Sequence, residues 1–170
     1  MEKEKPETFD ADSNDRNLSL QCGDAIEISL RIEKQGLLFY ESAANKIHNL
    51  KIKEVFSRLA GEEIEHIQIL QEKARFLQSA IPKQNKPKKN LEHIFEVERI
   101  FPTLDDSAMK NIQSDKQALD LGIESEEKSI KVLKDLLGKE RKLDVKTVFS
   151  HLLVEEKKHH LLLQELRRQL

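Results

Sequence analysis

The sequence predicts an all-α protein, a four-helix bundle made of two repeated helical hairpins that a long crossover joins. Three observations support this prediction. Charged residues make up 35% of the chain, with only 5 Gly and 4 Pro, a composition that suits long helices. Four segments place apolar residues at spacings of three and four, the period of one helix face. The second half also repeats the first, because moving 93 positions takes Val55-Phe56-Ser57 to Val148-Phe149-Ser150.

Length and composition set limits on the function. The 170 residues, 38% of them hydrophobic, suffice for one domain with a real core. A net charge of −2 gives no basic field, so we expect neither nucleic acid nor an anionic membrane as a partner. Cys22 is the only cysteine, which excludes an internal disulfide. No apolar run reaches the ~18 residues of a membrane span and no signal-peptide core is present, so we expect a cytoplasmic protein.

The chain divides into a tail and a bundle. Residues 1–22 are charged and polar and predict a flexible N-terminal tail, whereas 23–170 predict the bundle. The hairpins are expected at about 24–79 and 115–169, with the crossover at about 80–114. In the crossover, lysines between Pro82 and Lys89 predict a solvated loop, and residues 91–101 predict a short helix on the bundle that Pro102 ends.

Four long helices are expected within the hairpins. The first runs from about 24 to 47 with Asp24 as N-cap, and the second from about 51 to 78 after a short turn. The third runs from about 115 to 137 with Gly138 as C-cap, and the fourth from about 143 to the C-terminus. Short turns make each hairpin antiparallel, and the long crossover lets the second and third helices run parallel.

Charged residues interrupt the apolar stripe of every long helix. The first and third stripes each carry one glutamate at mid-helix with small residues on both sides, and the second and fourth each carry Glu-x-x-His. The shift of 93 positions pairs these residues between the two hairpins. The set comprises Glu33, Glu63, His66, Glu126, Glu156 and His159.

Such a set requires a partner for its charge. Carboxylates are almost never fully buried unless they are paired or bound to metal, and four neighbouring carboxylates would repel one another. Cations resolve both problems, and oxygen and nitrogen ligands suit iron or manganese, with zinc as an alternative. Positions i and i+3 share one helix face, so both side chains of Glu-x-x-His reach one site. A buried polar network of Glu, His and Tyr40 without metal is the competing interpretation.

The residues around these positions resemble a known family. The first half places Gly36, Phe39 and Tyr40 after Glu33, and the second half reads Glu126-Glu127-Lys128-Ser129-Ile130. From about Asp24 to the C-terminus the chain resembles the rubrerythrin-like branch of the ferritin-like di-iron proteins. The resemblance implies two iron ions bridged by Glu63 and Glu156. It also implies terminal carboxylates from Glu33 and Glu126 and one nitrogen ligand each from His66 and His159.

Tyr40 is a further candidate residue of the site, and the chain differs from the rubrerythrin pattern in three respects. Tyr40 lies seven residues after Glu33 on the same face, so we expect it to donate a hydrogen bond to a ligand carboxylate, with core packing as the alternative. Its repeat position is Leu133. Ser129 stands where rubrerythrins proper have a further glutamate, and one cysteine cannot build their rubredoxin module. Glu124 and Glu127 lie off the inward face and are expected at the surface.

Three functions follow as hypotheses. The first is a di-iron oxidoreductase that reduces peroxide, or oxidises ferrous iron with dioxygen, and takes electrons from an external donor. The second is iron or manganese binding or storage without turnover. The third is a metal-free structural bundle that acts through partner contacts. We also expect a homodimer, either of complete bundles or with hairpins exchanged between the subunits.

Overall fold

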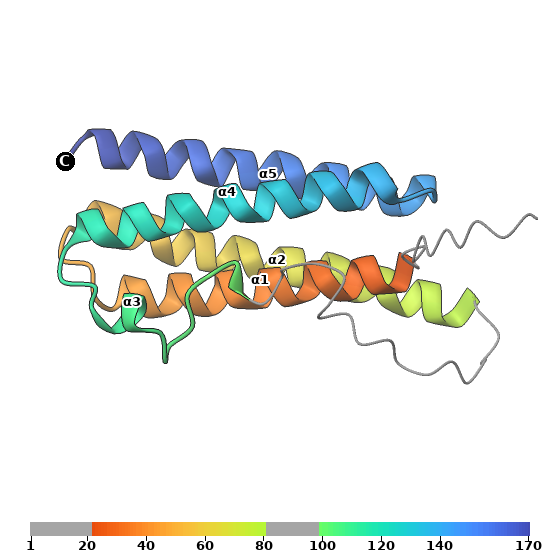
Figure 1. Cartoon of the computed structure of the whole chain (residues 1–170), viewed down its shortest axis with the longest axis horizontal. Helices are drawn as coiled ribbons and strands as arrows, with labels where there is room; N and C mark the ends of the chain where they lie inside the picture. The colour runs from red at the N-terminus through yellow and green to blue at the C-terminus, as the bar shows by residue number, and fades with distance from the viewer. Residues whose placement is uncertain (1–21, 81–98) are drawn as a thin grey trace, which may run out of the picture.

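The structure, a computed structural model, describes residues 22–80 and 99–170. Four long helices dominate it: α1 (Cys22–Ala44), α2 (Leu50–Ala80), α4 (Asp115–Lys139) and α5 (Leu143–Arg168), together with the one-turn helix α3 (Ser107–Lys110) (Figure 1). The described residues contain no strand. The predicted all-α four-helix bundle is therefore confirmed.

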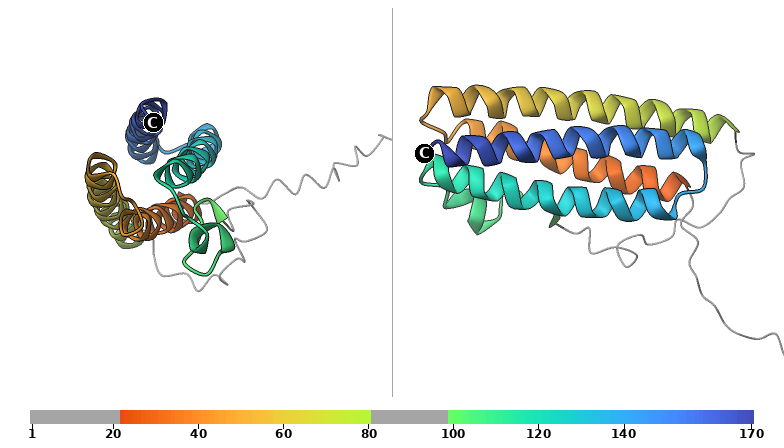
Figure 2. Two further views of the ribbon diagram at one scale, coloured as in Figure 1. Left: turned by 90° about the vertical axis from the view of Figure 1, so that its left-hand side faces the viewer. Right: turned by 90° about the horizontal axis from the view of Figure 1, so that it is seen from above.

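The helices form two antiparallel hairpins that pack against each other. α1 pairs with α2, and α4 pairs with α5, while α2 and α4 run in the same direction (Figure 1). Seen end-on, each long helix stands at one corner, with α1 beside α4 and α2 beside α5 (Figure 2). Helices side by side in the bundle are thus antiparallel, and all four present one face to the centre. None of the described helices is long and apolar enough to cross a membrane.

The helix ends differ from the prediction in a few places. α1 begins at Cys22, so Asp24 lies in its first turn and is not its N-cap. α4 continues through Gly138 to Lys139, and no glycine among the described residues has a positive φ. The predicted C-cap at Gly138 was therefore wrong. The helix ends at Lys139 and its C-cap is Glu140, whose backbone is extended and whose N–H donates to the carbonyl of Leu136 at 2.9 Å.

Polar contacts at one end hold the hairpins in register. The Ser114 side chain accepts a hydrogen bond from the N–H of Gln117 and caps α4. The next residue, Asp115, accepts from the backbone N–H groups of His48 and Asn49 at 2.8 and 2.9 Å. These two donors lie in the turn between α1 and α2. One carboxylate therefore joins the start of the second hairpin to the tip of the first.

Several predictions concern residues outside the described ranges. Residues 1–21 of the expected tail, the lysine-rich loop and residues 91–98 of the expected short helix all lie there, whereas Cys22 begins α1. The described part of the crossover is anchored on α1, because the Gln35 side chain accepts from the N–H groups of Ile100 and Phe101 at 3.1 and 3.3 Å. Helix α3 was not predicted, since four residues are too short to show a helical period.

The core follows the predicted stripes. Every residue of the four inward stripes is buried, including the charged ones. Beside the charged residues lies an aromatic cluster in which Phe39 and Tyr40 each contact the other rings at centroid distances of 5.2 to 6.1 Å, formed by Phe39, Tyr40, Phe56 and Phe101. The repeat positions of Phe39 and Tyr40 are Val132 and Leu133. The aromatic packing therefore comes mainly from the first hairpin.

Candidate metal centre

All six charged residues of the stripes meet at the middle of the bundle. α1 and α4 contribute Glu33 and Glu126, and the Glu-x-x-His motifs of α2 and α5 contribute two residues each. His66 is the most exposed of the six, at 4%. The site is therefore an interior one, made by four helices at the same level.

The six residues form two overlapping groups. In the first, one ligand atom from each residue lies within 4.8 Å of all the others, and its members are Glu33, Glu63, His66 and Glu156. The second group meets the same limit, with Glu63, Glu126, Glu156 and His159. Glu63 and Glu156 belong to both groups. The geometry therefore offers two neighbouring metal positions that share two carboxylates.

The first group centres on Nδ1 of His66. This atom lies 3.0 Å from Oε2 of Glu33, 3.5 Å from Oε1 of Glu156 and 3.7 Å from Oε2 of Glu63. All three oxygens come from different helices. One imidazole nitrogen and three carboxylates thus converge on a space with room for a cation.

The second group centres on Nδ1 of His159. This atom lies 3.6 Å from Oε1 of Glu63, 3.7 Å from Oε1 of Glu126 and 4.0 Å from Oε1 of Glu156. Both histidines therefore present the same nitrogen to the carboxylates. Each member of the second group is the repeat counterpart, 93 positions away, of a member of the first group.

Unpaired atoms test whether this set fits a metal. Buried atoms without a hydrogen-bond partner include one oxygen of each glutamate and one histidine nitrogen: Glu33 Oε1, Glu63 Oε1, Glu126 Oε2, Glu156 Oε1 and His159 Nδ1. Each such buried group costs roughly 1–3 kcal/mol when it stays unsatisfied. Carboxylate oxygen and imidazole nitrogen are also the ligand types that iron, manganese and zinc accept. The residues present fit a pair of such ions.

The carboxylates hold protons strongly when no cation balances them. Burial raises the pKa of Glu156 to about 8, and the charge of Glu126 adds to the shift. Burial also raises the pKa of Glu63, together with the charges of Glu156 and Glu33, and burial raises that of Glu126. Protons and metal ions therefore compete for the same oxygens.

The pKa of the His66 imidazole is raised, although burial alone would lower it. Burial by itself lowers the pKa of His66, but the neighbouring carboxylates of Glu156, Glu33 and Glu63 outweigh that effect and raise it. In the metal-free protein an imidazolium thus offsets part of the negative charge. A metal ion would replace that proton and use the freed nitrogen as a ligand.

Tyr40 contacts the centre directly. Its side chain is fully buried, and its hydroxyl donates a hydrogen bond to Oε1 of Glu126, which reaches from the first hairpin into the second. Burial and then the negative charge of Glu126 raise the pKa of Tyr40 well above its usual value. The side chain is therefore a neutral phenol and a hydrogen-bond donor.

Small residues leave room for the carboxylates. A Cβ atom on Gly36 would lie 3.2 Å from Cδ of Glu63 and 3.4 Å from a ring carbon of Phe101. Ser129, the repeat counterpart of Gly36, is fully buried, and its hydroxyl has no partner. A larger side chain at position 36 would therefore press against the Glu63 carboxylate and the Phe101 ring.

One contact was missed from the sequence. Oε2 of Glu62 lies 2.8 Å from Nε2 of His159, the ring nitrogen that faces away from the carboxylates. The pair Glu62-Glu63 recurs as Glu155-Glu156, and this recurrence was the available indication. Glu124 and Glu127 were expected at the surface of α4 and do lie there. Glu124 forms an ion pair with Lys128, and Glu127 forms one with His160.

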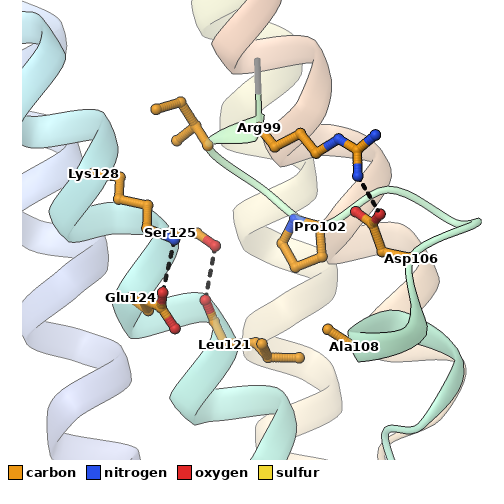
Figure 3. A pocket seen from close by; sticks show the side chains of 9 residues that line it. Arg99, Pro102, Asp106, Ala108, Leu121, Glu124, Ser125 and Lys128 are labelled. Carbon is orange, nitrogen blue, oxygen red and sulfur yellow. Dashed lines mark hydrogen bonds and ion pairs between the residues drawn. The ribbon is translucent and has the colours of Figure 1, made fainter. Parts of the chain in front are cut away.

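A pocket of about 240 Å³ lies elsewhere, between α4 and the segment around Pro102 (Figure 3). Its charged groups are paired with one another: Arg99 with Asp106 at 3.1 Å, and Lys128 with Glu124 at 2.7 Å. The Ser125 hydroxyl donates to the carbonyl of Leu121 (Figure 3). No polar side chain shown there lacks a partner, in contrast to the buried centre.

Fold and site together define the class. The four-helix bundle has the ferritin-like fold, and its two groups of buried Glu and His, which share two carboxylates, could each hold a metal ion. The sequence pattern of the Rubrerythrin family matches residues 24–167. The chain therefore belongs to the rubrerythrin family, whose members typically bind two iron ions.

Solved structures agree on the fold. A ferritin-like diiron-carboxylate protein from Thermotoga maritima is similar with a TM-score of 0.64 and 21% identity, over 88% of this chain and 96% of that one. A hypothetical protein from Pyrococcus furiosus has a TM-score of 0.63 and 19% identity, over 90% and 92%. No curated protein matches the chain.

Proposed function

We propose that this protein binds two iron ions and uses them to reduce peroxide or to oxidise ferrous iron, as a defence against oxidative stress. The observation that carries the proposal is the sharing of Glu63 and Glu156 between two complete ligand groups. Two shared carboxylates would hold two ions close enough to act on one small oxidant. Manganese or zinc would fit the same ligands.

Charge balance supports two ions and not one. The four glutamates carry four negative charges when ionised, which two divalent cations neutralise. The site is closed to solvent, with every ligand at 4% exposure or less. An uncompensated charge there would cost far more than the fold can supply. A neutral cluster removes that cost.

The surrounding residues suit redox chemistry. Two ferrous ions, when bound, supply one electron each, and reduction of peroxide to two waters takes two electrons and two protons. Tyr40 holds Glu126 in place through its hydroxyl and remains a phenol. The rings of Phe39 and Phe56 pack against Tyr40 and keep bulk water away from that side. Repeated turnover then requires an external electron donor.

Metal binding without turnover is the second candidate. The observation that favours it is Ser129, an uncharged hydroxyl where the resemblance to rubrerythrins proper would place a further carboxylate. With six ligands and no seventh, the iron ions would have fewer ways to change their coordination between oxidation states. Iron uptake would then persist while peroxide turnover stayed negligible.

The deciding experiment loads metal-free protein with ferrous iron under anaerobic conditions. Elemental analysis should give about two ions per chain on the proposal. Added peroxide should then be consumed faster than by the same amount of free iron, with a change in near-ultraviolet absorbance. Uptake without consumption would select the binding function. A chain that retains no metal would contradict both and leave a structural bundle.

A further inference from the structure

The two metal positions have related ligands but different surroundings. At the candidate metal position that includes Glu126 and His159, Tyr40 donates a hydrogen bond to the Glu126 carboxylate and Glu62 contacts the His159 imidazole. The residue 93 positions after Tyr40 is Leu133, whose side chain has no hydrogen-bonding group. The position of Glu33 and His66 therefore lacks a counterpart of the tyrosine contact.

Glu62 determines which nitrogen of His159 is free. Its Oε2 lies 2.8 Å from Nε2, and a carboxylate can only accept, so Nε2 must donate its proton. The lone pair of the neutral ring then resides on Nδ1, which faces Glu63, Glu126 and Glu156. Nδ1 is buried without a partner, as a nitrogen ready for a metal would be.

Glu62 is itself held in place. It belongs to α2 and reaches across to α5, with a side chain that is 37% exposed. Nε of Arg58, one helical turn earlier, lies 3.4 Å from its other oxygen. This arrangement leaves Oε2 for His159. The contact is therefore built from both helices of the α2–α5 interface.

The repeat counterpart of Glu62 does something else. Glu155 is paired with Lys158 of its own helix at 2.7 Å, and hydrogen bonding to Lys158 lowers its pKa. The counterpart of Lys158 is Glu65, so the first hairpin has no lysine there to compete for Glu62. Within residues 22–80 and 99–170, no ion pair to Nε2 of His66 occurs.

We propose that Glu62 is a positioning residue that makes the metal position of Glu126 and His159 the tighter of the two, so that the chain fills its positions in order. The inference rests on the proposed two-metal function and specifies which half of the centre binds first. A carboxylate that accepts from a ligand histidine fixes its orientation and increases its basicity. Loss of such a partner lowers metal affinity by roughly 10–100-fold.

Titration of metal-free protein with Co(II) tests the inference without any turnover. Visible absorption follows occupancy, and a competing chelator measures each step. Wild type should bind two ions in two resolved steps. Glu62→Ala should weaken the tighter step by roughly 10–100-fold and leave the other unchanged. Glu155→Ala is the matched control, since it removes the repeat counterpart at an equivalent helical position, and it should leave both steps unchanged.

A second readout follows the imidazole itself. In the zinc-loaded protein, the Nε2–H proton of His159 should give a downfield proton resonance that exchanges slowly with water. This resonance should disappear in Glu62→Ala and persist in Glu155→Ala. Circular dichroism of each variant verifies that the helices are intact.

The outcomes separate the two proposals. Wild type that binds two ions, with Glu62→Ala unchanged in both steps and in the proton resonance, overturns the role of Glu62 alone. Equal losses in Glu62→Ala and Glu155→Ala, or a loss in the weaker step only, overturn it as well. Wild type that binds no cobalt, zinc or iron overturns the proposed function and this inference with it.

Discussion

The imidazole rings of His66 and His159 stack with their centroids 5.6 Å apart and their planes 15° apart. The two residues are 93 positions apart in sequence and come from α2 and α5, which are neighbours in the bundle. Counterpart positions of the two hairpins thus meet across an approximate two-fold axis. Glu63 and Glu156 are likewise counterparts 93 positions apart, and each belongs to both ligand groups.

Removal of a shared carboxylate should empty both positions. Glu63→Ala deletes a ligand from each group, whereas Glu33→Ala deletes one from the first group only. We expect fewer than one ion per chain in Glu63→Ala and about one in Glu33→Ala, against about two in wild type. Elemental analysis after anaerobic iron loading measures this.

Glu124→Ala is the control for that series, because Glu124 lies at the surface of α4 in a pair with Lys128. It should retain both ions. The metal-free Glu63→Ala protein should unfold at the same temperature as metal-free wild type or above it, because it loses a buried carboxyl group with an unsatisfied oxygen. Equal metal content in Glu63→Ala and Glu33→Ala would contradict a bridging position for Glu63.

Tyr40→Phe should affect one of the two ions. The substitution keeps the ring contacts with Phe39 and Phe56 but removes the hydrogen bond to Glu126. Loss of this kind of support costs roughly 10-fold or more in metal affinity. We expect the tighter of two cobalt-binding steps to weaken.

The control for Tyr40 is Phe39→Leu, which alters the packing of the same cluster without touching a hydrogen bond. It should lower the unfolding temperature and leave both affinities within experimental error. If Phe39→Leu and Tyr40→Phe change the metal affinities to the same extent, the hydroxyl of Tyr40 has no specific role.

Gly36→Ala should displace the carboxylate of Glu63. The added methyl would lie 3.2 Å from Cδ of Glu63, so the carboxylate must move by a few tenths of an ångström. Overpacking of this kind costs roughly 1–3 kcal/mol. We expect a lower unfolding temperature together with weaker binding of both ions, measured by calorimetry and by metal titration.

Gly61→Ala provides the matched comparison, because nothing lies within 4 Å of a Cβ atom there. It lies in the middle of α2, where Ala stabilises a helix by up to about 1 kcal/mol relative to Gly. That variant should be more stable and bind metal normally. Normal metal binding in Gly36→Ala would show that the close approach to Glu63 is not needed.

Stability of the metal-free protein should fall as the pH rises. The pKa values of Glu63, Glu126 and Glu156 are raised above those of the unfolded chain, with Glu156 at about 8, so the folded state holds more protons from about pH 4.5 to 8. The raised pKa of His66 acts in the same direction above about pH 6.5. The free energy of unfolding therefore decreases through this window.

Thermal unfolding between pH 5 and 8 measures the effect. The metal-free protein should lose stability steadily, and the metal-loaded protein should not, because cations replace the protons. The difference between their unfolding temperatures should thus increase with pH. Parallel curves would mean that the buried carboxylates do not control this dependence.

The helical period and the repeat predicted most of the architecture. Glu33 and Glu126 stood out because each occupies a stripe position where the period requires an apolar residue. The structure buries both and places them with the two Glu-x-x-His motifs. Side-chain periodicity is a local property, so one sequence suffices to detect it.

Features that depend on a contact between helices were not predictable. Glu62 and Glu155 look equivalent in the repeat, yet one contacts His159 and the other contacts Lys158. The choice depends on the geometry of the α2–α5 interface and on a lysine in one copy only. The prediction of a C-cap at Gly138 was wrong for a different reason. The Glu140 carboxylate accepts hydrogen bonds from the backbone N–H groups of Arg141 and Lys142, and α4 ends there without a residue in the left-handed conformation.

The hydrogen bond from Tyr40 to Glu126 has an optical consequence. The chain contains one tyrosine and no tryptophan. All phenol emission of the protein therefore originates from a single ring that contacts a carboxylate of the metal centre, and no indole obscures it. The protein thus contains an intrinsic fluorophore at the site of interest, and filling or oxidation of the centre should be visible in its emission without any label.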